Sequence, residues 1–521
     1  MERIAMKKDY LLKERPMRAL FLFALPMIIG NLFQQFYTMA DSMVVGRYVS
    51  ENALAAVGAS YSLTNVFICI AIGGGVGASV LTSRYFGAQE YRRMKLSIST
   101  ALLSFLAVSL ILAALGLLLG REFMIFLKTP EDILDMAVEY LDIYFMGLPF
   151  LFMYNVLSSM FNALGRSRIP LYLLIFSSVF NIILDIYLVR SLGLGIAGVA
   201  WATLIAQGIS ALVSFVIFLR ELQAYPASYT ENNSSSNAQA DMPEPQNPAS
   251  KIRIGSSKLK SDAPETCTSP LVTYGDSSDD PKAIPAVFPE KESTFLRSIR
   301  KYYSFRELLT MCRVALPSIF QQSTVSIGMM LVQSVVNSFG PQMLAGFSAG
   351  MRVESICIVP MAALGNAMSS YTAQNLGAKQ KERVVKGYHS ALKLVAFFAL
   401  ILCLILEVFH SSIIASFLGS DGTKVALETG SSYLRFIGFF FALIGLKMCT
   451  DGLLRGAADM KMFTIANLAN LSLRVIFAVT MAPRFGIAMV WYAVPLGWLV
   501  NFLISYGEYR TGKWRTKLQT T

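Results

Sequence analysis

Long apolar runs separated by short polar segments dominate the chain. A helix needs about 20 mostly apolar residues to cross the hydrocarbon core of a bilayer. Twelve stretches reach this length, and each predicts one membrane-spanning helix. Their approximate ranges are 17–45, 52–80, 95–119, 136–164, 169–190, 195–219, 307–338, 342–372, 386–409, 427–455, 461–482 and 486–508. The first run is too long for a cleavable signal peptide, so we expect it to remain as a span. The pattern predicts an all-α membrane protein.

Composition supports this prediction and excludes several classes of protein. Hydrophobic residues make up 54% and charged residues 15% of the chain, against about 25% charged in soluble domains. Mean hydropathy is +0.52. The two histidines cannot form a multi-histidine metal centre, and six cysteines without a C-x-x-C pair indicate no zinc or disulfide framework.

The net charge of +12 is distributed unevenly between the two ends of the predicted spans. If the amino terminus is cytoplasmic, the short cytoplasmic segments carry 22 Lys and Arg residues and the external ones carry 6. The positive-inside rule therefore predicts a multi-pass protein of the cell membrane with both termini cytoplasmic. This placement requires an even number of spans, and it accounts for the basic charge without a nucleic-acid partner.

A polar segment separates the sixth span from the seventh. The stretches 229–248 and 269–281 are rich in Ser, Asn, Pro and Asp, and neither shows apolar periodicity. Such a segment cannot bury enough surface to offset its ordering entropy. We interpret residues 221–304 as a disordered cytoplasmic linker, although a regulatory or partner-binding arm is a second interpretation. The remaining domains are an amino-terminal lobe, 1–220, and a carboxy-terminal lobe, 305–521, with six spans each.

The two lobes carry an internal repeat. LAAVGA at 54–59 matches LAGFSA at 344–349, and RYFGAQ at 84–89 matches QNLGAK at 374–379, both at an offset of 290. ALP and GIA segments recur at an offset of 291. Six spans per copy insert both copies with the same orientation, so the lobes are expected to be related by a pseudo-two-fold axis along the membrane normal. This arrangement is typical of transporters.

Two acidic residues lie within apolar spans of the amino-terminal lobe, Asp41 in the first and Asp185 in the fifth. A carboxylate at mid-helix costs about 2.5–3.5 kcal/mol on insertion scales, so each one indicates a functional site. Helical spacing places further polar residues on the same faces, and a third polar stripe lies on the sixth span. These three stripes are Asn31, Gln34, Thr38 and Asp41; Ser178, Asn181 and Asp185; and Thr203, Gln207 and Ser210.

Two carboxylates in a water-poor pocket cannot easily both be ionised. The pair could therefore hold a proton, or it could hold Na⁺ with oxygens of Asn181 and Thr203. The alternative is a set of structural polar contacts between helices.

Several segments resemble the multidrug and toxic compound extrusion (MATE) family of transporters. The segment 25–58 is similar to the family's first-helix region, 82–93 to the following cytoplasmic loop, and 162–170 with 181–189 to its fourth and fifth helices. The segment 374–380 is also similar to MATE sequences, whereas the linker is longer than usual for the family. The resemblance implies a V-shaped pair of six-helix lobes and cation-driven export of small organic, often cationic, compounds. We expect the protein to be a monomer.

The resemblance also implies residue roles. Asp41, Asn181, Asp185 and Thr203 match the family's amino-lobe cation site, where H⁺ or Na⁺ would be the coupling ion and no other cofactor is expected. Bending of the first helix at Pro26 is one way in which protonation could release substrate, and a static kink is the alternative.

The carboxy-terminal lobe does not repeat the acids, because an offset of 291 places Val332 and Ile476 at the positions of Asp41 and Asp185. It has its own acids, Glu354 and Asp451, and Lys447 stands four residues before Asp451, which predicts an ion pair. Side chains expected to line a substrate cavity are Gln34, Tyr37, Thr38, Asn155, Asn162, Gln322, Gln333, Glu354 and Asp451.

Two other functions are compatible with a chain of many membrane spans. A flippase for lipids or lipid-linked saccharides of the same superfamily often has fourteen spans and a strongly cationic cavity, and twelve spans with two acids favour the exporter. A membrane enzyme would need a catalytic motif, but the sequence contains no G-x-S-x-G, H-E-x-x-H or P-loop pattern. We therefore expect no enzymatic activity, and small molecules and the lipid bilayer as the binding partners.

Overall fold

The computed structural model describes residues 9–127, 129–225, 302–418 and 423–516, and these ranges are helical without a strand. Eleven helices are long and apolar enough to cross a membrane, and a bent pair of shorter helices completes the twelfth span. The prediction of twelve spans is confirmed. The predicted linker lies almost entirely outside the described residues. The segments before and after it belong to one compact unit.

The amino-terminal half begins with a short helix, α1, and continues with six spans. α2 begins with Pro16, whose fixed φ suits the first helical position, and it continues through Pro26 as one helix. The Ser50 hydroxyl caps α3 by accepting from the Ala53 N–H at 3.0 Å. The bounds are α1 (Tyr10–Lys13), α2 (Pro16–Tyr48), α3 (Glu51–Gly87), α4 (Tyr91–Phe126), α5 (Glu131–Ala163), α6 (Arg168–Ile186) with the π-turn η2 (Tyr187–Ser191), and α7 (Gly195–Gln223).

The carboxy-terminal half repeats this order. Its elements are α9 (Phe305–Asn337), α10 (Pro341–Gly377), α11 (Lys381–Leu418), α12 (Lys424–Gly438), α13 (Phe441–Gly456), α14 (Met460–Phe485), α15 (Ala488–Thr511) and the 3₁₀ turn η3 (Lys513–Arg515). The predicted span over 427–455 is present as a bent pair of helices, because α12 and α13 meet at an angle of 55°. The break follows Gly438, a weak helix former, and an apolar window does not detect such a break.

The helix bounds refine the repeat. α3 and α10 correspond at an offset of 290, whereas α5 corresponds to α12 and α13 at 293. Backbone geometry follows the same offsets: Gln89 and Lys379 both have φ of 60°. The position equivalent to Asp185 is therefore Ala478. The predicted partner Ile476 is wrong because α11 and the segment that follows it are together three residues longer than their counterparts in the first half. Both residues are apolar, so the acid is still not repeated.

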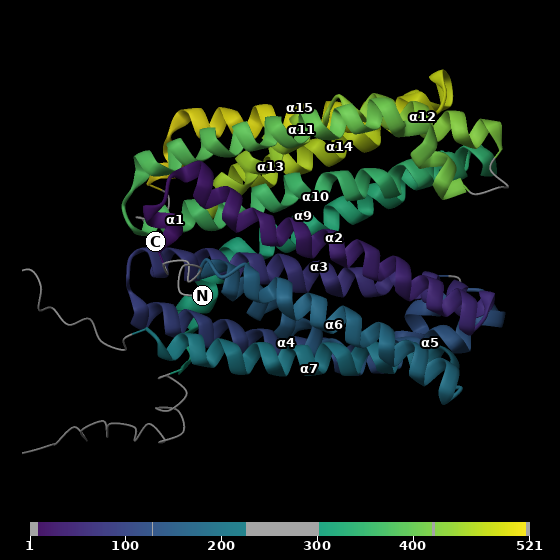
Figure 1. The fold of residues 1–521 in the computed structure, drawn as a ribbon, viewed down its shortest axis with the longest axis horizontal. Helices are drawn as coiled ribbons and strands as arrows, with labels where there is room; N and C mark the ends of the chain where they lie inside the picture. The colour runs from purple at the N-terminus through teal and green to yellow at the C-terminus, as the bar shows by residue number, and fades with distance from the viewer. Residues whose placement is uncertain (1–8, 128, 226–301, 419–422, 517–521) are drawn as a thin grey trace, which may run out of the picture. The chain divides into compact units, whose positions relative to one another are not determined.

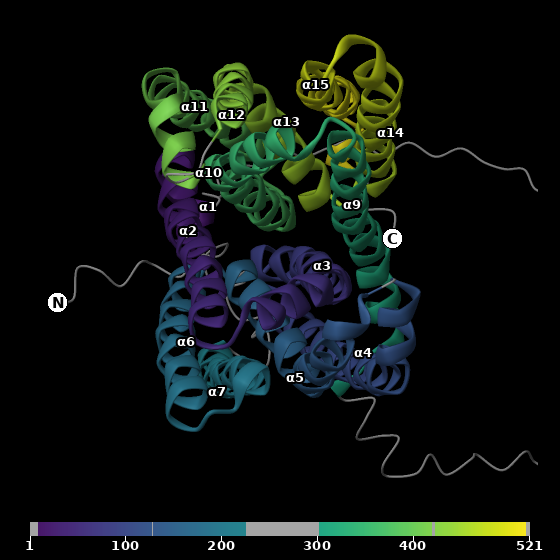
Figure 2. The same ribbon diagram turned by 90° about the vertical axis from the view of Figure 1, so that its right-hand side faces the viewer.

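The first span of each half lies between the halves. α2 contacts α6 of its own half and α10 and α11 of the other, while α9 contacts α14 of its own half and α3 and α4 of the other. Figure 2 shows these two helices on opposite sides of the unit, as a pseudo-two-fold relation requires. Movement of one half relative to the other must therefore displace both helices.

The carboxyl-terminal ends of α3 and α10 meet at the end that carries α1, on the left of Figure 1. We call this the basic end, after Lys13, Arg84, Lys379, Lys381 and Arg515. A Cβ at Gly87 would overlap the backbone of Gln374, and a Cβ at Gly377 would overlap that of Arg84. Across the same boundary the Gln374 amide donates to the Ala163 carbonyl at 2.7 Å. These contacts close the space between the halves at the basic end.

Candidate functional site

Asp41 of α2 and Asp185 of α6 lie next to each other, close enough for their carboxyl groups to share a hydrogen bond. Asp185 is fully buried, while Asp41 is partly buried. A carboxylate can only accept hydrogen bonds, so a bond between two carboxyl groups requires one proton in the pair. The two acids form a site at which a single proton can be held.

The Asn181 amide lies among the polar groups around this pair. Its hydrogen bonds are satisfied when its nitrogen donates to the Tyr37 hydroxyl and to Asp185 Oδ2, each at 3.0 Å, and its oxygen accepts from the Thr203 N–H at 3.0 Å. The choice of orientation follows from this network. The structure thus places Tyr37, Asn181 and Thr203 together with the acids, from three helices.

A small cavity of about 10 Å³ adjoins the site and is lined in part by Tyr140, Tyr144, Thr203 and Gln207. A volume of this size is close to the minimum for one water molecule. Within the described part of the chain, the Oδ1 atoms of Asp41 and Asp185 have no hydrogen-bond partner. A buried acceptor without a partner is costly, so both atoms are available to bind a water molecule or a cation.

The donor set is a poor match to a metal cage. The described residues contain no group of three or more His, Cys, Asp or Glu side chains arranged around a common point. The satisfied orientation of Asn181 turns its N–H groups, and not its oxygen, toward Asp185. Two free carboxylate oxygens and the nearby hydroxyls are the available ligands, and hard cations such as Mg²⁺ and Ca²⁺ take six or more oxygen ligands.

The other predicted cavity residues of the amino-terminal half do not gather around one space. Gln34 and Thr38 are exposed on α2, where the Thr38 hydroxyl donates to the Gln34 carbonyl at 2.9 Å. The Asn155 amide bonds to a carbonyl of its own helix, Leu151 O, at 2.9 Å. Asn162 is partly buried, and its Oδ1 has no partner among the described residues.

The remaining candidates occupy three places in the carboxy-terminal half. Gln333 bonds to Asn337 at 3.2 Å on an exposed stretch of α9. Glu354 is buried in α10 and accepts a hydrogen bond from the Tyr433 hydroxyl. Gln322 and Asp451 line a cavity of about 150 Å³ between the halves, together with residues of α3, α10 and α13.

Asp451 belongs to a buried network on the carboxy-terminal side of this central cavity. Its ion pair with Lys447, at 3.2 Å, confirms the predicted i,i+4 pair. The Asn467 amide bridges the two charges, with its oxygen 3.2 Å from Lys447 Nζ and its nitrogen 3.3 Å from Asp451 Oδ2. The Ser505 hydroxyl donates to Asp451 Oδ1 at 2.7 Å. The charge of Asp451 is therefore paired within the protein.

Sequence reasoning missed Tyr140, Tyr144, Asn467 and Ser505. The two tyrosines are four residues apart, so helical spacing could have marked one face of α5, but aromatic residues at this spacing usually form core contacts.

The repeat offset of 293 makes Tyr140 equivalent to Tyr433 and Asn181 equivalent to Arg474. Arg474 interacts electrostatically with Glu354. Both halves thus build a polar cluster at corresponding positions, and the paired acids are found in the amino-terminal cluster.

The fold and the site define a helical membrane protein with two repeated halves and a buried carboxyl pair in one of them. The MatE family model matches this chain twice, at residues 26–187 and 317–480, which confirms the repeat. The chain belongs to the MatE family, the MATE transporters.

Relatives and solved structures agree with this assignment. The chain is 25% identical to the probable multidrug resistance protein YpnP of Bacillus subtilis (strain 168), over 96% of both chains. It is 28% identical to the multidrug export protein MepA of Staphylococcus haemolyticus (strain JCSC1435), over 39% of this chain and 45% of MepA.

Among solved structures, a MOP superfamily transporter from Pyrococcus furiosus superimposes with a TM-score of 0.79 at 21% identity, covering 98% of this chain and 99% of that one. An outward-facing multidrug resistance MATE transporter gives a TM-score of 0.78, also at 21% identity and with the same coverage. These likenesses support the two-lobed fold.

Proposed function

We propose that this protein exports small organic compounds, many of them cationic, in exchange for protons, and that Asp41 and Asp185 are the coupling site. The observation that carries the proposal is the pair of adjacent carboxyl groups inside the amino-terminal half. The multidrug names of the relatives support the substrate class. The close packing at the basic end supports a state that is open toward the opposite side, as an exporter needs when it releases substrate.

The Asn181 amide favours H⁺ over Na⁺ as the coupling ion. Na⁺ would be bound by oxygen atoms, but the Asn181 oxygen is engaged by the Thr203 N–H and its N–H groups face Asp185 and Tyr37. A proton needs only the two carboxyl groups. The same N–H groups stabilise the ionised form of Asp185 after the proton leaves.

The pair also explains how a proton and a cationic substrate could exclude each other. With the proton removed, two negative charges lie close together in a water-poor site, which is unfavourable. A cationic substrate or a returning proton relieves this repulsion, so each favours departure of the other. Exchange follows without any direct contact between proton and substrate.

The free energy released when one proton crosses the membrane is close to the free energy required to export one substrate molecule. One charge that crosses 100 mV provides about 2.3 kcal/mol. A hundredfold substrate gradient costs about 2.8 kcal/mol, at about 1.4 kcal/mol per factor of ten. A modest pH gradient in addition to the membrane potential would supply the rest.

The proposal is tested by dye efflux from drug-sensitive cells that express Asp41→Asn or Asp185→Asn. Asparagine keeps the shape of each side chain but cannot release a proton, so we expect each variant to lose most of its efflux at wild-type protein levels. Asp135→Asn is the matched control, because Asp135 is exposed and pairs with Arg121 on the surface. Wild-type efflux by both site variants would contradict the proposed site.

A further inference from the structure

A cavity of about 570 Å³ lies at the basic end, between the two halves and away from the carboxyl pair. Five of its lining residues are cationic, and they come from α1, α3, the start of α11 with the loop before it, and η3. They are Lys13, Arg84, Lys379, Lys381 and Arg515. The volume is in the range of ordinary small-molecule sites.

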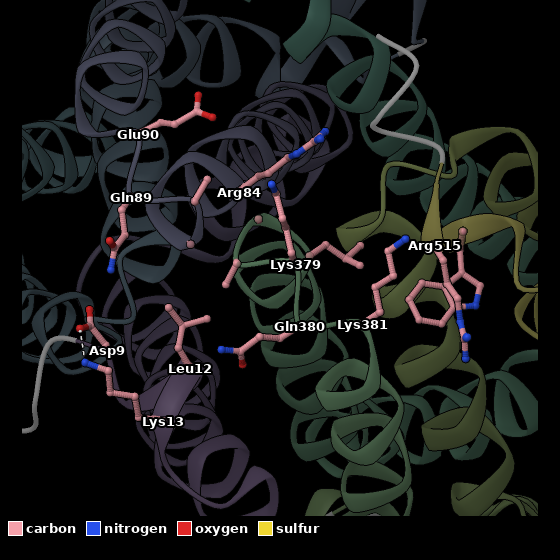
Figure 3. A pocket seen from close by; sticks show the side chains of 16 residues that line it. Asp9, Leu12, Lys13, Arg84, Gln89, Glu90, Lys379, Gln380, Lys381 and Arg515 are labelled. Atoms are coloured by element: carbon pink, nitrogen blue, oxygen red, sulfur yellow. Dashed lines mark hydrogen bonds and ion pairs between the residues drawn. The ribbon is translucent and has the colours of Figure 1, made fainter. Parts of the chain in front are cut away.

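The two acidic residues that line the cavity already have partners. Asp9 pairs with Lys13 at 3.1 Å, and Glu90 pairs with Arg93 at 3.2 Å. In Figure 3 the Asp9 carboxylate lies beside Lys13, and Glu90 lies on the Arg84 side of the cavity, away from Lys379 and Lys381. Glu90 attracts Arg84 electrostatically, but these two acids do not neutralise Lys379 and Lys381.

Arg84, Lys379 and Lys381 have no acidic partner within 4.0 Å in the described ranges. Arg84 belongs to the amino-terminal half and the two lysines to the other half. Figure 3 shows the Lys379 side chain extending toward Arg84, and the backbones touch at Gly377. Closure of the basic end thus brings like charges from the two halves together, which is unfavourable unless an anion lies between them.

Lys379 is held in place by the backbone. It has a φ of 60°, a left-handed conformation that is uncommon for residues other than glycine, and its N–H donates to the Leu376 carbonyl at 3.0 Å. The equivalent residue of the first half, Gln89, has the same φ and lines the same cavity. Equivalent residues of the two halves thus line the cavity, and of this pair only Lys379 is positively charged.

We propose that this cavity binds a phosphate-bearing anion, and that the bound anion stabilises the arrangement in which the basic end is closed. A phosphate group would be held by Arg84, Lys379 and Lys381 at once, which ties the two halves together. Because the cavity exists only while α3 and α10 touch, binding there shifts the equilibrium toward the closed basic end. The phosphate can come from an anionic lipid headgroup or from a soluble phosphate.

The test measures thermal stability of the full-length protein in nanodiscs with two separate probes. The lipid probe compares phosphatidylcholine with a mixture of phosphatidylcholine and phosphatidylglycerol. The soluble probe adds inorganic pyrophosphate to phosphatidylcholine nanodiscs, with sodium chloride at equal ionic strength as reference. We expect at least one probe to raise the melting temperature of the wild-type protein, and the probe that does so identifies the source of the phosphate.

The key variant is Lys379→Gln with Lys381→Gln. Gln is compatible with the left-handed position because Gln89 adopts it in the first half. Loss of two cations should weaken binding of the effective probe about thirtyfold, since each cation near an anionic headgroup contributes roughly a factor of five. The matched control is Arg92→Gln with Lys386→Gln, which removes the same charge from exposed positions outside the cavity lining.

The control should keep the full stabilisation by the effective probe, and the key variant should lose it. Equal responses of the two variants, or no response of the wild-type protein to either probe, would overturn the proposal. Neither readout depends on transport, so the result is independent of the coupling role of Asp41 and Asp185.

Discussion

The amide of Asn181 determines which atoms face the acid pair, and the proposed mechanism depends on these atoms. It bonds to Tyr37, Asp185 and the backbone of Thr203. The acids themselves could be predicted from the sequence, since a carboxylate in an apolar span is conspicuous. The orientation of the amide could not, because it depends on contacts from three helices that only the fold brings together.

Replacement of Asn181 by alanine should damage the site while both acids remain. The change removes the N–H groups that stabilise ionised Asp185, so the buried carboxylate loses a hydrogen-bond donor. Unpaired buried polar groups cost about 1–3 kcal/mol. We expect lower thermal stability and strongly reduced dye efflux.

For thermal stability the control is Asn155→Ala, because the Asn155 amide bonds only to Leu151 O on its own helix among the described contacts. If Asn181→Ala loses no more thermal stability than Asn155→Ala, the hydrogen bonds of Asn181 do not stabilise the site.

The Lys447–Asp451 pair predicts a second residue-scale effect, on stability. Both side chains are at most 7% exposed. Lys447→Met removes the cation nearest to Asp451 and leaves only the weaker attraction of Arg455. Breaking a buried pair typically costs about 3–5 kcal/mol, and we expect a loss near the lower end of this range. Addition of Asp451→Leu removes the negative charge as well and should restore much of the stability. Denaturation of the single and double variants measures this coupling, and additive effects would contradict it.

At the scale of helices, the lengths of the spans follow from the apolar runs, but two features do not. The 55° break between α12 and α13 falls inside one continuous apolar run, so hydropathy has no signal for it. The repeat offset changes from 290 to 293 because α11 and the segment after it are longer, which moves the partner of Asp185 to Ala478. The short sequence matches have offsets of 290 and 291 and lie outside α5 and α6, so they do not detect this change.

The packing of α3 against α9 depends on two glycines. A Cβ at Gly73 would lie 2.6 Å from Ile319 Cα, and one at Gly77 would overlap the backbone of Ala315. Gly77→Leu should therefore force the helices apart, at a typical overpacking cost of about 1–3 kcal/mol. Gly58→Leu, on the same helix with nothing within 4 Å of its Cβ position, is the control.

Thermal unfolding in detergent should show a clearly lower melting temperature for Gly77→Leu and little change in melting temperature for Gly58→Leu. Equal stability of the two variants would mean that α3 and α9 can separate at no cost, in disagreement with the observed packing.

At the scale of the whole molecule, two halves of six spans form one unit through contacts that do not involve the segment between them. The described residues on each side of that segment bond to each other directly: the Tyr85 hydroxyl donates to Glu307 at 3.0 Å, and the Asn65 amide donates to Ser326 at 3.0 Å. The division into halves was predictable from composition and repeat, whereas these cross-contacts involve neutral or paired residues without a sequence signature.

Deletion of residues 230–295 with a short glycine-serine replacement should therefore leave insertion, folding and dye efflux close to wild type. The contacts that join the halves among the described residues lie outside the deleted range. Efflux per inserted molecule is the measurement. Loss of efflux by a correctly inserted protein would show that the segment has a direct role in transport.

The proton-coupled carboxyl pair is tested most directly in proteoliposomes, with purified protein and a fluorescent organic cation as substrate. The wild-type protein should move the cation when a pH gradient is imposed without Na⁺, and should not respond to a Na⁺ gradient alone. Asp185→Asn should lose the response to the pH gradient, and Asp135→Asn should keep it. Transport driven by Na⁺ alone, or pH-driven transport by Asp185→Asn at the wild-type rate, would contradict the account.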